Sequence, residues 1–314
     1  MSRKRAVFHT LYLLVIHSCG QEDKQKPRTS SFSLSHLILT FLVVVLSQVP
    51  ISATPISAYP NKLLENTSQD EASVQLEQGR KYYEAGQFVA AAKVWQQAEQ
   101  VATEGDRLNR AMILSNLSLA YQQLGQWDDA KGAIASCLSL LGYSGEKRAK
   151  GARGDGGEIQ NLQVLAQALN TQGSLQLALG QSEQALSTWQ QAGAIYHKVS
   201  DRTGIIRSLI NQAQALRALG LYRRALTTLI QADEILQKQP DSQIKAASLR
   251  NLGITLQLIG NANQSRQVLQ KSLVLAQKLK SPSDISAALL SLGNTARTQE
   301  DALAARAVAV RTFA

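Results

Sequence analysis

Side chains that could carry out chemistry are few beyond residue 60. The only histidine there is His197 and the only thiol is Cys137, and neither stands near a second catalytic group in the sequence. An active site needs a nucleophile and an acid–base group placed together. Asp128 and Asp129 stand at the predicted start of a helix, where carboxylates interact favourably with the helix dipole. We therefore predict no catalytic residues, no metal site and no cofactor, and we expect that the chain is not an enzyme.

The segment 141–160, LGYSGEKRAKGARGDGGEIQ, contains six glycines and four basic residues. It does not form a phosphate-binding loop, because Gly157 stands six residues after Gly151, where that motif needs Lys. Its tripeptide Arg153-Gly154-Asp155 matches an integrin-recognition sequence, but three residues recur too often by chance to carry weight. We predict a flexible, basic insertion. The alternative is a protease-sensitive or regulatory loop.

Residues 1–60 have the three parts of a secretory signal. Basic residues precede a ten-residue apolar core, LILTFLVVVL at 37–46, and small residues ending at Ala53 or Ala58 follow it. The core is shorter than the roughly 20 residues of a membrane span. We therefore expect export to the periplasm or the exterior. The alternative is an uncleaved anchor, which would be the only part of the chain in the membrane.

A second, weaker basic-then-apolar pattern lies upstream and ends at Cys19. It faintly resembles a lipoprotein signal. We interpret residues 1 to about 26 as lying before the true start of translation.

Composition and charge narrow the class further. The formal net charge is +10, aromatic residues make up only 5%, and good helix formers dominate. The basic residues are interspersed with acidic ones and do not cluster with aromatic residues, as a nucleic-acid groove would require. The sequence therefore predicts an all-α protein that does not bind nucleic acid and whose partner could be acidic.

A repeat of about 40 residues organises the chain after residue 71. Five glycines each end one amphipathic stretch and open another: Gly86, Gly125, Gly180, Gly220 and Gly260. The corresponding frames begin at Ala72, Ala111, Ala166, Ile206 and Ala246, and a sixth begins at Ser286. Self-similarity of this length is typical of stacked repeats.

Small residues recur at fixed places in these frames. Seven residues before each glycine stand Gly79, Ser118, Gly173, Ala213 and Gly253, and five residues after it stand Ala91, Ala130, Ala185, Ala225 and Ser265. Four residues further on are the large side chains of Trp95, Ile134, Trp189, Leu229 and Leu269, and three beyond those are Ala98, Cys137, Ala192, Ala232 and Ser272. Small residues at fixed places predict two helices that cross closely, with Cys137 as a packing residue.

This pattern resembles the tetratricopeptide repeat family. In the first frame the matching residues are Gly79, Tyr82, Gly86, Phe88, Ala91, Trp95 and Ala98, and the resemblance extends from Ala72 to about Thr298. It implies a linker at 61–71 and then, over 72–314, a right-handed superhelical solenoid of about five to six antiparallel helix pairs. The period exceeds the family's usual value of about 34. In the sixth frame, Glu300 replaces the glycine, which predicts a degenerate second helix.

The family's fold implies a function as a protein–protein interaction scaffold. An export signal before such repeats is also similar to the front part of secreted cyanobacterial proteins in which the repeats precede a caspase-like CHAT domain. That domain would lie beyond Ala314, so no protease activity is carried over. The alternative function is the recognition or regulatory arm of a truncated or split CHAT-type protease system.

The resemblance implies that the first helices of the pairs line a concave groove that binds a partner segment. The sixth position of the frame holds Asn116, Asn211 and Asn251, whose amides could pair with a peptide backbone. Alternatively, these amides hydrogen bond to neighbouring helices. Five further polar residues are expected on the same face, where the guanidinium groups would favour carboxylates: Arg207, Gln214, Arg217, Arg250 and Arg297.

The C-terminal segment 301–314, DALAARAVAVRTFA, lacks the polar outer face of a capping helix. A solenoid needs such a cap because its last repeat has no neighbour. We therefore predict self-association through this helix, unless a missing downstream domain covers it.

Overall fold

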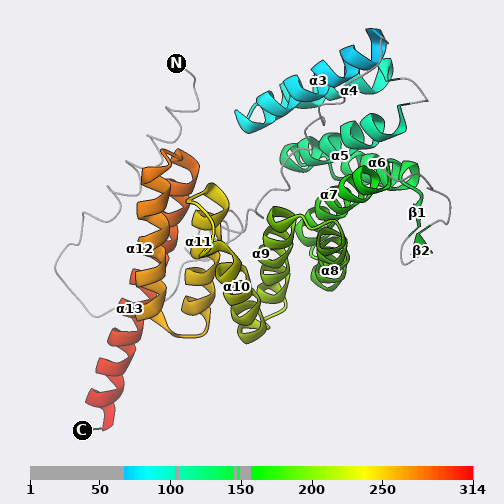
Figure 1. The fold of residues 1–314 in the computed structure, drawn as a ribbon. Coiled ribbons are helices and arrows are strands. Elements are labelled where there is room, and N and C mark those ends of the chain that lie inside the picture. Colours follow the sequence, from blue (N-terminus) through cyan, green and yellow to red (C-terminus); the bar gives the residue numbers. More distant parts are fainter. Residues whose placement is uncertain (1–66, 103–105, 145–146, 149–156, 314) are drawn as a thin grey trace, which may run out of the picture. The chain divides into compact units, whose positions relative to one another are not determined.

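The computed structural model describes residues 67–102, 106–144, 147–148 and 157–313 (Figure 1). The predicted export signal at 1–60 and most of the predicted linker lie outside the described residues. Among the described residues, no helix is both long enough and apolar enough to cross a membrane.

Eleven helices make up nearly all of the described chain, and successive helices pack on one another as pairs (Figure 1). The helices are α3 (Thr67–Glu84), α4 (Phe88–Val101), α5 (Arg107–Leu124), α6 (Trp127–Leu140), α7 (Gly157–Ala178), α8 (Ser182–Lys198), α9 (Arg202–Ala218), α10 (Tyr222–Leu236), α11 (Gln243–Leu258), α12 (Ala262–Lys278) and α13 (Pro282–Phe313). Each first helix also packs on the second helix of the preceding pair. The fold is therefore an α-solenoid of helix pairs, as predicted.

The five predicted glycines form the turns within the pairs. Each has a left-handed backbone conformation, with φ between 72° at Gly86 and 83° at Gly260. Glycine adopts this region without steric penalty, which makes it the usual residue just after a helix C-terminus. The predicted turn positions are confirmed. Two turns between pairs use Ser200 and Lys280, also at positive φ, and these were not predicted.

The predicted close crossings are present in the first, third and fifth pairs. A Cβ atom added to Gly173 would lie 2.5 Å from Trp189 Nε1, and one added to Gly79 would lie 2.3 Å from Trp95 Nε1. Each indole covers its glycine and donates a hydrogen bond to a carbonyl of the first helix, from Trp189 to Asn170 at 3.2 Å and from Trp95 at 3.0 Å. The fixed small residues thus make room for large side chains of the second helix.

The register predicts unequal effects of two neighbouring substitutions on α8. Ala185 is fully buried beside Trp189 and Ala215, whereas Ser187 is exposed. Ala185→Leu should overpack this contact and lower the free energy of unfolding by about 1–3 kcal/mol. Ser187→Leu should change it by less than about 0.5 kcal/mol. Denaturant melts of both variants measure the difference, and equal losses would show that the assigned register is wrong.

Two helix boundaries and one short ribbon differ from the sequence-based prediction. Helix α3 already begins at Thr67, inside the predicted linker, and α7 begins at Gly157, inside the predicted insertion. Between α6 and α7, strand β1 (Tyr143–Ser144) pairs antiparallel with β2 (Lys147–Arg148). The Tyr143 hydroxyl bonds to Gln191 Oε1 on α8. This part of the insertion is therefore an anchored ribbon, a small exception to the all-helical prediction.

The sixth frame is one continuous helix and not a pair with a degenerate second member. Helix α13 runs through Glu300 without a turn. Every other frame reverses at a glycine with positive φ, a conformation that a glutamate rarely adopts. Consistent with the missing partner helix, a Cβ atom added to Gly293 would meet nothing within 4 Å.

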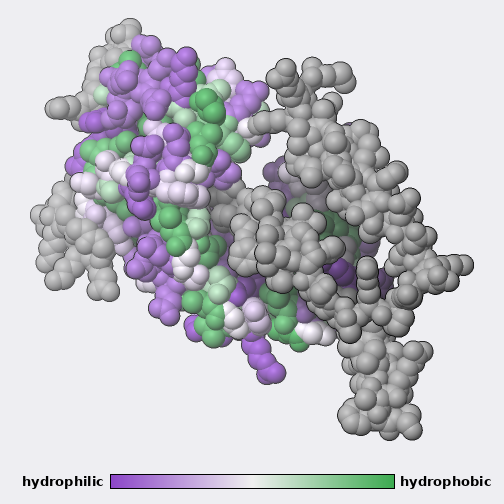
Figure 2. Space-filling view, turned by 180° about the vertical axis from the view of Figure 1, so that it is seen from behind, coloured by the Kyte–Doolittle hydropathy of each residue, from purple (hydrophilic) through white to green (hydrophobic). Residues whose placement is uncertain are grey.

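The solvated surface mixes polar and apolar side chains. Figure 2 shows hydrophilic and hydrophobic residues interspersed over the coloured part of one face. Scattered exposed apolar residues are normal on folded proteins, so hydropathy alone does not mark a functional surface.

Candidate functional site

The residues most suited to catalysis are not arranged as an active site. Cys137 is fully buried on α6, where burial raises the pKa of its thiol, while His197 is exposed near the end of α8. Asp128 and Asp129 lie exposed in the first turn of α6. Within the described part of the chain, no three His, Cys, Asp or Glu side chains are grouped so that they could hold a metal ion. Cys137 thus has the packing environment expected of it.

The polar residues predicted to bind a partner come from four first helices. Helices α5, α7, α9, α11 and α13 pack on one another in succession, so they form one continuous surface, here called the first-helix surface. Asn116 lies on α5, and α9 carries Arg207, Asn211, Gln214 and Arg217. Helix α11 carries Arg250 and Asn251, and α13 carries Arg297.

The three asparagines of the predicted ladder are buried. Asn116, Asn211 and Asn251 are 0%, 1% and 3% exposed. Asn211 Nδ2 donates to Asn170 Oδ1 on α7 at 3.3 Å, and Asn251 Nδ2 donates to the Ala247 carbonyl at 2.9 Å. These bonds favour the alternative in which the amides bond within the helical array. A partner could reach them only if neighbouring side chains moved, so their role in binding stays a prediction.

The other predicted residues differ in accessibility. Gln214 is buried, at 6% exposed, Arg207 is half-buried and Arg297 is exposed. Exposed arginines bind anions only weakly because water screens their charge. Arg207 already interacts with another group. The stronger candidates are therefore the two remaining arginines, which are partly desolvated.

Arg217 and Arg250 come from neighbouring first helices and are both half-buried. Arg217 Nη1 donates to the Asn251 carbonyl at 3.2 Å and to Thr255 Oγ1 at 3.4 Å, so its guanidinium reaches from α9 to α11. Arg250 Nε is buried and has no hydrogen-bond acceptor. Neither arginine forms an ion pair with any carboxylate of the described residues.

The pKa values of both guanidinium groups reflect this environment. Burial lowers the pKa of Arg217 to about 10, and the positive charge of Arg250 contributes to the shift. Burial also lowers the pKa of Arg250, and this is partly offset by the charge of Asp284 at the start of α13. Two desolvated like charges without a paired anion are unfavourable. A partner carboxylate bound beside them would supply the missing negative charge.

Sequence reasoning found both arginines but missed Thr255 and Asp284, which lie around them. It also missed Asn170, which bonds to Asn211. Thr255 stands four residues after Asn251 on α11, and that helical spacing was the only signal available for it. Asn170 is not at the sixth position of its frame, so the ladder pattern did not include it.

Comparison with known proteins rests on structure. No family profile matches the sequence, and no curated protein matches it. Among solved structures, a Rap protein complexed with competence and sporulation factor is 15% identical with a TM-score of 0.58, covering 79% of this chain and 65% of that chain. The apo form of RapI is 16% identical with a TM-score of 0.54, covering 67% of this chain and 72% of that one.

A third similar structure is a signal transduction ATPase from Pyrococcus horikoshii that has a tetratricopeptide repeat sensor. It is 14% identical to this chain, with a TM-score of 0.57. The match covers 72% of this chain and 33% of that protein. With the glycine turns and close crossings described above, these likenesses show that the described part of the chain has the helical-repeat fold of tetratricopeptide repeat proteins.

Proposed function

We propose that the chain is a protein-interaction scaffold whose first-helix surface binds an acidic segment of a partner protein at Arg217 and Arg250. The observation that carries this proposal is the pair of partly desolvated guanidinium groups that form no ion pair with any carboxylate of the described residues. Charge-assisted hydrogen bonds from arginine are strong and directional, and they strengthen where water is excluded. A partner carboxylate therefore gains more here than at an exposed arginine.

The fold is compatible with this function. The similar Rap structure is a complex with competence and sporulation factor, so a protein of this fold can hold a binding partner. The partner of the present chain is defined here only by its chemistry, as a segment with carboxylates spaced to reach both guanidinium groups.

Peptide binding tests the proposal. A fluorescein-labelled peptide rich in Glu, compared with the same peptide carrying Gln, should bind more tightly in fluorescence anisotropy. Arg217→Met with Arg250→Met should weaken binding of the Glu peptide by about a hundredfold or more, since two charged hydrogen bonds are lost and each is worth about 1.5–3 kcal/mol. The matched control is Arg223→Met with Arg224→Met, two exposed arginines on α10.

Two outcomes would contradict the proposal. One is equal affinity for the Glu and Gln peptides. The other is equal weakening by the control pair, which would reduce the effect to overall charge. Asn211→Ala with Asn251→Ala serves as a third comparison, because loss of stability without a specific loss of affinity would assign these amides to the helical array alone.

Export is part of the proposed function. We propose that residues 1–60 direct the chain to the periplasm or the exterior, with a membrane anchor as the alternative. Fractionation of the source cells should recover the chain outside the cytoplasm. Removing residues 1–60 should retain it inside, and a chain that remains cytoplasmic with these residues present would overturn the proposal.

A further inference from the structure

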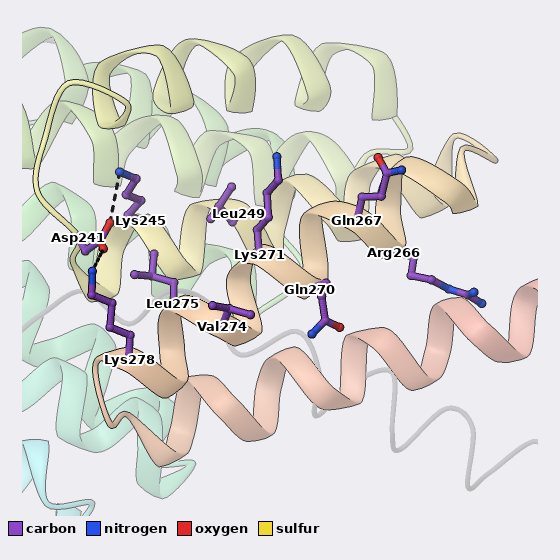
Figure 3. Close-up of a pocket in the computed structure, with 10 residues that line it drawn as sticks. All are labelled: Asp241, Lys245, Leu249, Arg266, Gln267, Gln270, Lys271, Val274, Leu275 and Lys278. Carbon is purple, nitrogen blue, oxygen red and sulfur yellow. Dashed lines mark hydrogen bonds and ion pairs between the residues drawn. The ribbon is translucent and has the colours of Figure 1, made fainter.

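A groove of about 830 Å³ runs along α11 and α12 (Figure 3). Its lining combines two kinds of side chain. Leu249, Val274 and Leu275 are apolar, whereas Lys245, Lys271 and Lys278 are cationic. None of these residues belongs to the set predicted from the sequence to bind a partner.

The floor of the groove is apolar and partly in contact with water. Leu275 is buried at 7% exposed and Leu249 is half-buried, but Val274 is 55% exposed. An aliphatic side chain exposed beside other aliphatic side chains gains free energy when a partner's apolar group covers it, at about 25 cal/mol for each Å² removed from water.

The charges around this floor are mainly positive. The only carboxylate lining the groove is Asp241, which bonds to Lys278 at 2.7 Å and lies 3.6 Å from Lys245 (Figure 3). The Lys278 ammonium holds the pKa of this carboxyl below its usual range. Lys271 forms no ion pair with the described residues. One carboxylate shared by two lysines, with a third lysine unpaired, leaves an excess of positive charge beside the apolar floor.

The groove is separate from the first-helix surface although both use α11. Lys245 and Leu249 are four residues apart and therefore lie on one face of the helix. Arg250 lies about 100° around the helix from Leu249. Variants in the groove and variants at Arg217 or Arg250 can thus be tested independently.

A second groove of the described chain has a lining of the opposite charge. A groove of about 550 Å³ lies along α4, α5 and α6. Its Leu114 holds the same place in the repeat frame as Leu249, the fourth. Its lining carries Glu99, Asp128 and Asp129 in place of lysines. The chain therefore offers one basic and one acidic groove, and these suit partners of opposite charge.

We propose that the α11–α12 groove binds a segment of a partner protein that carries an apolar side chain flanked by carboxylates. The apolar side chain covers Leu249 and Val274, and the carboxylates pair with Lys271 and with the Lys245–Lys278 end of the groove. Such a segment matches both features of the surface. A nucleic acid would match only the charge.

Labelled peptides of defined composition test this directly. The probe is a fluorescein-labelled peptide of Leu and Glu. In the first comparison peptide Ser replaces each Leu, and in the second Lys replaces each Glu. The Leu–Glu probe should bind most tightly in fluorescence anisotropy. Lys271→Glu should weaken its binding about tenfold, since reversing a charge at a recognition site costs about 1.4 kcal/mol or more. Val274→Ser should weaken the Leu–Glu probe but not the Ser–Glu peptide.

The controls separate this groove from the rest of the molecule. Lys93→Glu on α4 is also an exposed lysine reversal and should have little effect. Arg217→Met with Arg250→Met should leave the groove component of binding unchanged. If this double variant abolished all binding of the probe, the groove proposal would be contradicted, and the first-helix site would account for the binding.

Other occupants of the groove would be recognised in the same experiment. Equal affinity for the Leu–Glu and Ser–Glu peptides, or an equally Lys271-dependent affinity for a single-stranded DNA oligonucleotide, would reduce the groove to a charged patch and overturn the proposal. Concentration-dependent self-association that Lys271→Glu abolishes in sedimentation experiments would assign the groove to a second copy of the chain. Lys271 and Val274 are exposed, so all variants should remain folded, which circular dichroism checks.

Discussion

Trp189→Ala should lower the free energy of unfolding by about 3–5 kcal/mol, the usual range for a fully buried tryptophan. Trp189 is 0% exposed, and its indole covers Gly173 while donating a hydrogen bond to the Asn170 carbonyl. Truncation leaves a cavity at the helix crossing and removes the bond to that carbonyl. Trp127→Ala is the matched control, because Trp127 is 39% exposed at the start of α6. That change should cost clearly less than the change at Trp189, because a partly exposed side chain loses less buried apolar area when it is truncated.

The same contact predicts a change of sign in a double-mutant cycle. Gly173→Ala alone should be destabilising, because its Cβ would lie 2.5 Å from Trp189 Nε1 and the buried, hydrogen-bonded ring cannot move freely. When Trp189 is already Ala, the same substitution should be stabilising by about 0.5–1 kcal/mol, the ordinary gain for Ala over Gly inside a helix. Gly132→Ala, into open space on α6, should show that gain in the wild-type background.

Urea melts of the four cycle members measure the coupling between Trp189 and Gly173. Contacting residues typically couple by about 0.5–3 kcal/mol. If Gly173→Ala had the same effect in both backgrounds, the indole would not lie over the glycine and the assigned helix crossing would be wrong.

Local backbone demands and fixed packing contacts were readable from the sequence. A turn that needs positive φ favours glycine, and this glycine recurs once per repeat, as at Gly180 and Gly220. A buried tryptophan that packs closely on the facing helix requires a glycine there, so the two residues occur together, as at Trp189 and Gly173. Both patterns recur at the same frame positions, so neighbouring frames reinforce one another. The turns and the close crossings were predicted, whereas the contact of each indole with its facing glycine was not.

Features that do not recur from one repeat to the next were not predicted. Ser200 and Lys280 adopt positive φ without being glycine, so their turns had no compositional signal. The lack of a glycine at Glu300 was noticed, but its consequence, a helix that continues to Phe313, depends on the absence of any competing turn. The small ribbon at Tyr143 depends on a distant side chain, Gln191.

The candidate site was predicted only in part, because the burial of each side chain depends on how neighbouring helices stack. The frame position placed Asn211 and Arg217 on the same helix face, but it could not show that the amide would be 1% exposed while the guanidinium reached across to α11. The distinction between a surface ladder and internal hydrogen bonds lies in how closely neighbouring first helices approach. The identity of one helix's residues does not fix that distance.

The desolvated arginine pair predicts opposite changes in stability and binding. Arg217→Met should raise the free energy of unfolding by about 1–3 kcal/mol in the absence of a partner, since replacing a poorly compensated buried charge by an apolar side chain of similar shape is often stabilising. Met keeps the packing of the aliphatic stem. The Asn251 carbonyl keeps a donor, because Thr255 Oγ1 also donates to it at 2.8 Å. The same variant should bind the Glu peptide more weakly, which is the trade between stability and function expected of a binding residue.

The stability gained by Arg217→Met should depend on pH, whereas a gain from repacking alone would not. The folded-state pKa of Arg217 is about 10, below its ordinary value. Between the folded and the unfolded pKa the unfolded chain binds more protons, so this group's destabilising contribution is fully present below pH 10 and is relieved as the pH rises above 10. Urea melts of wild type and Arg217→Met from pH 8 to 11.5 should therefore show the variant's advantage shrinking above pH 10, with lysine and tyrosine titration cancelling in the difference. An Arg217→Met variant that is less stable than wild type at pH 8, or whose advantage does not change with pH, would show that the guanidinium is adequately paired in the folded chain.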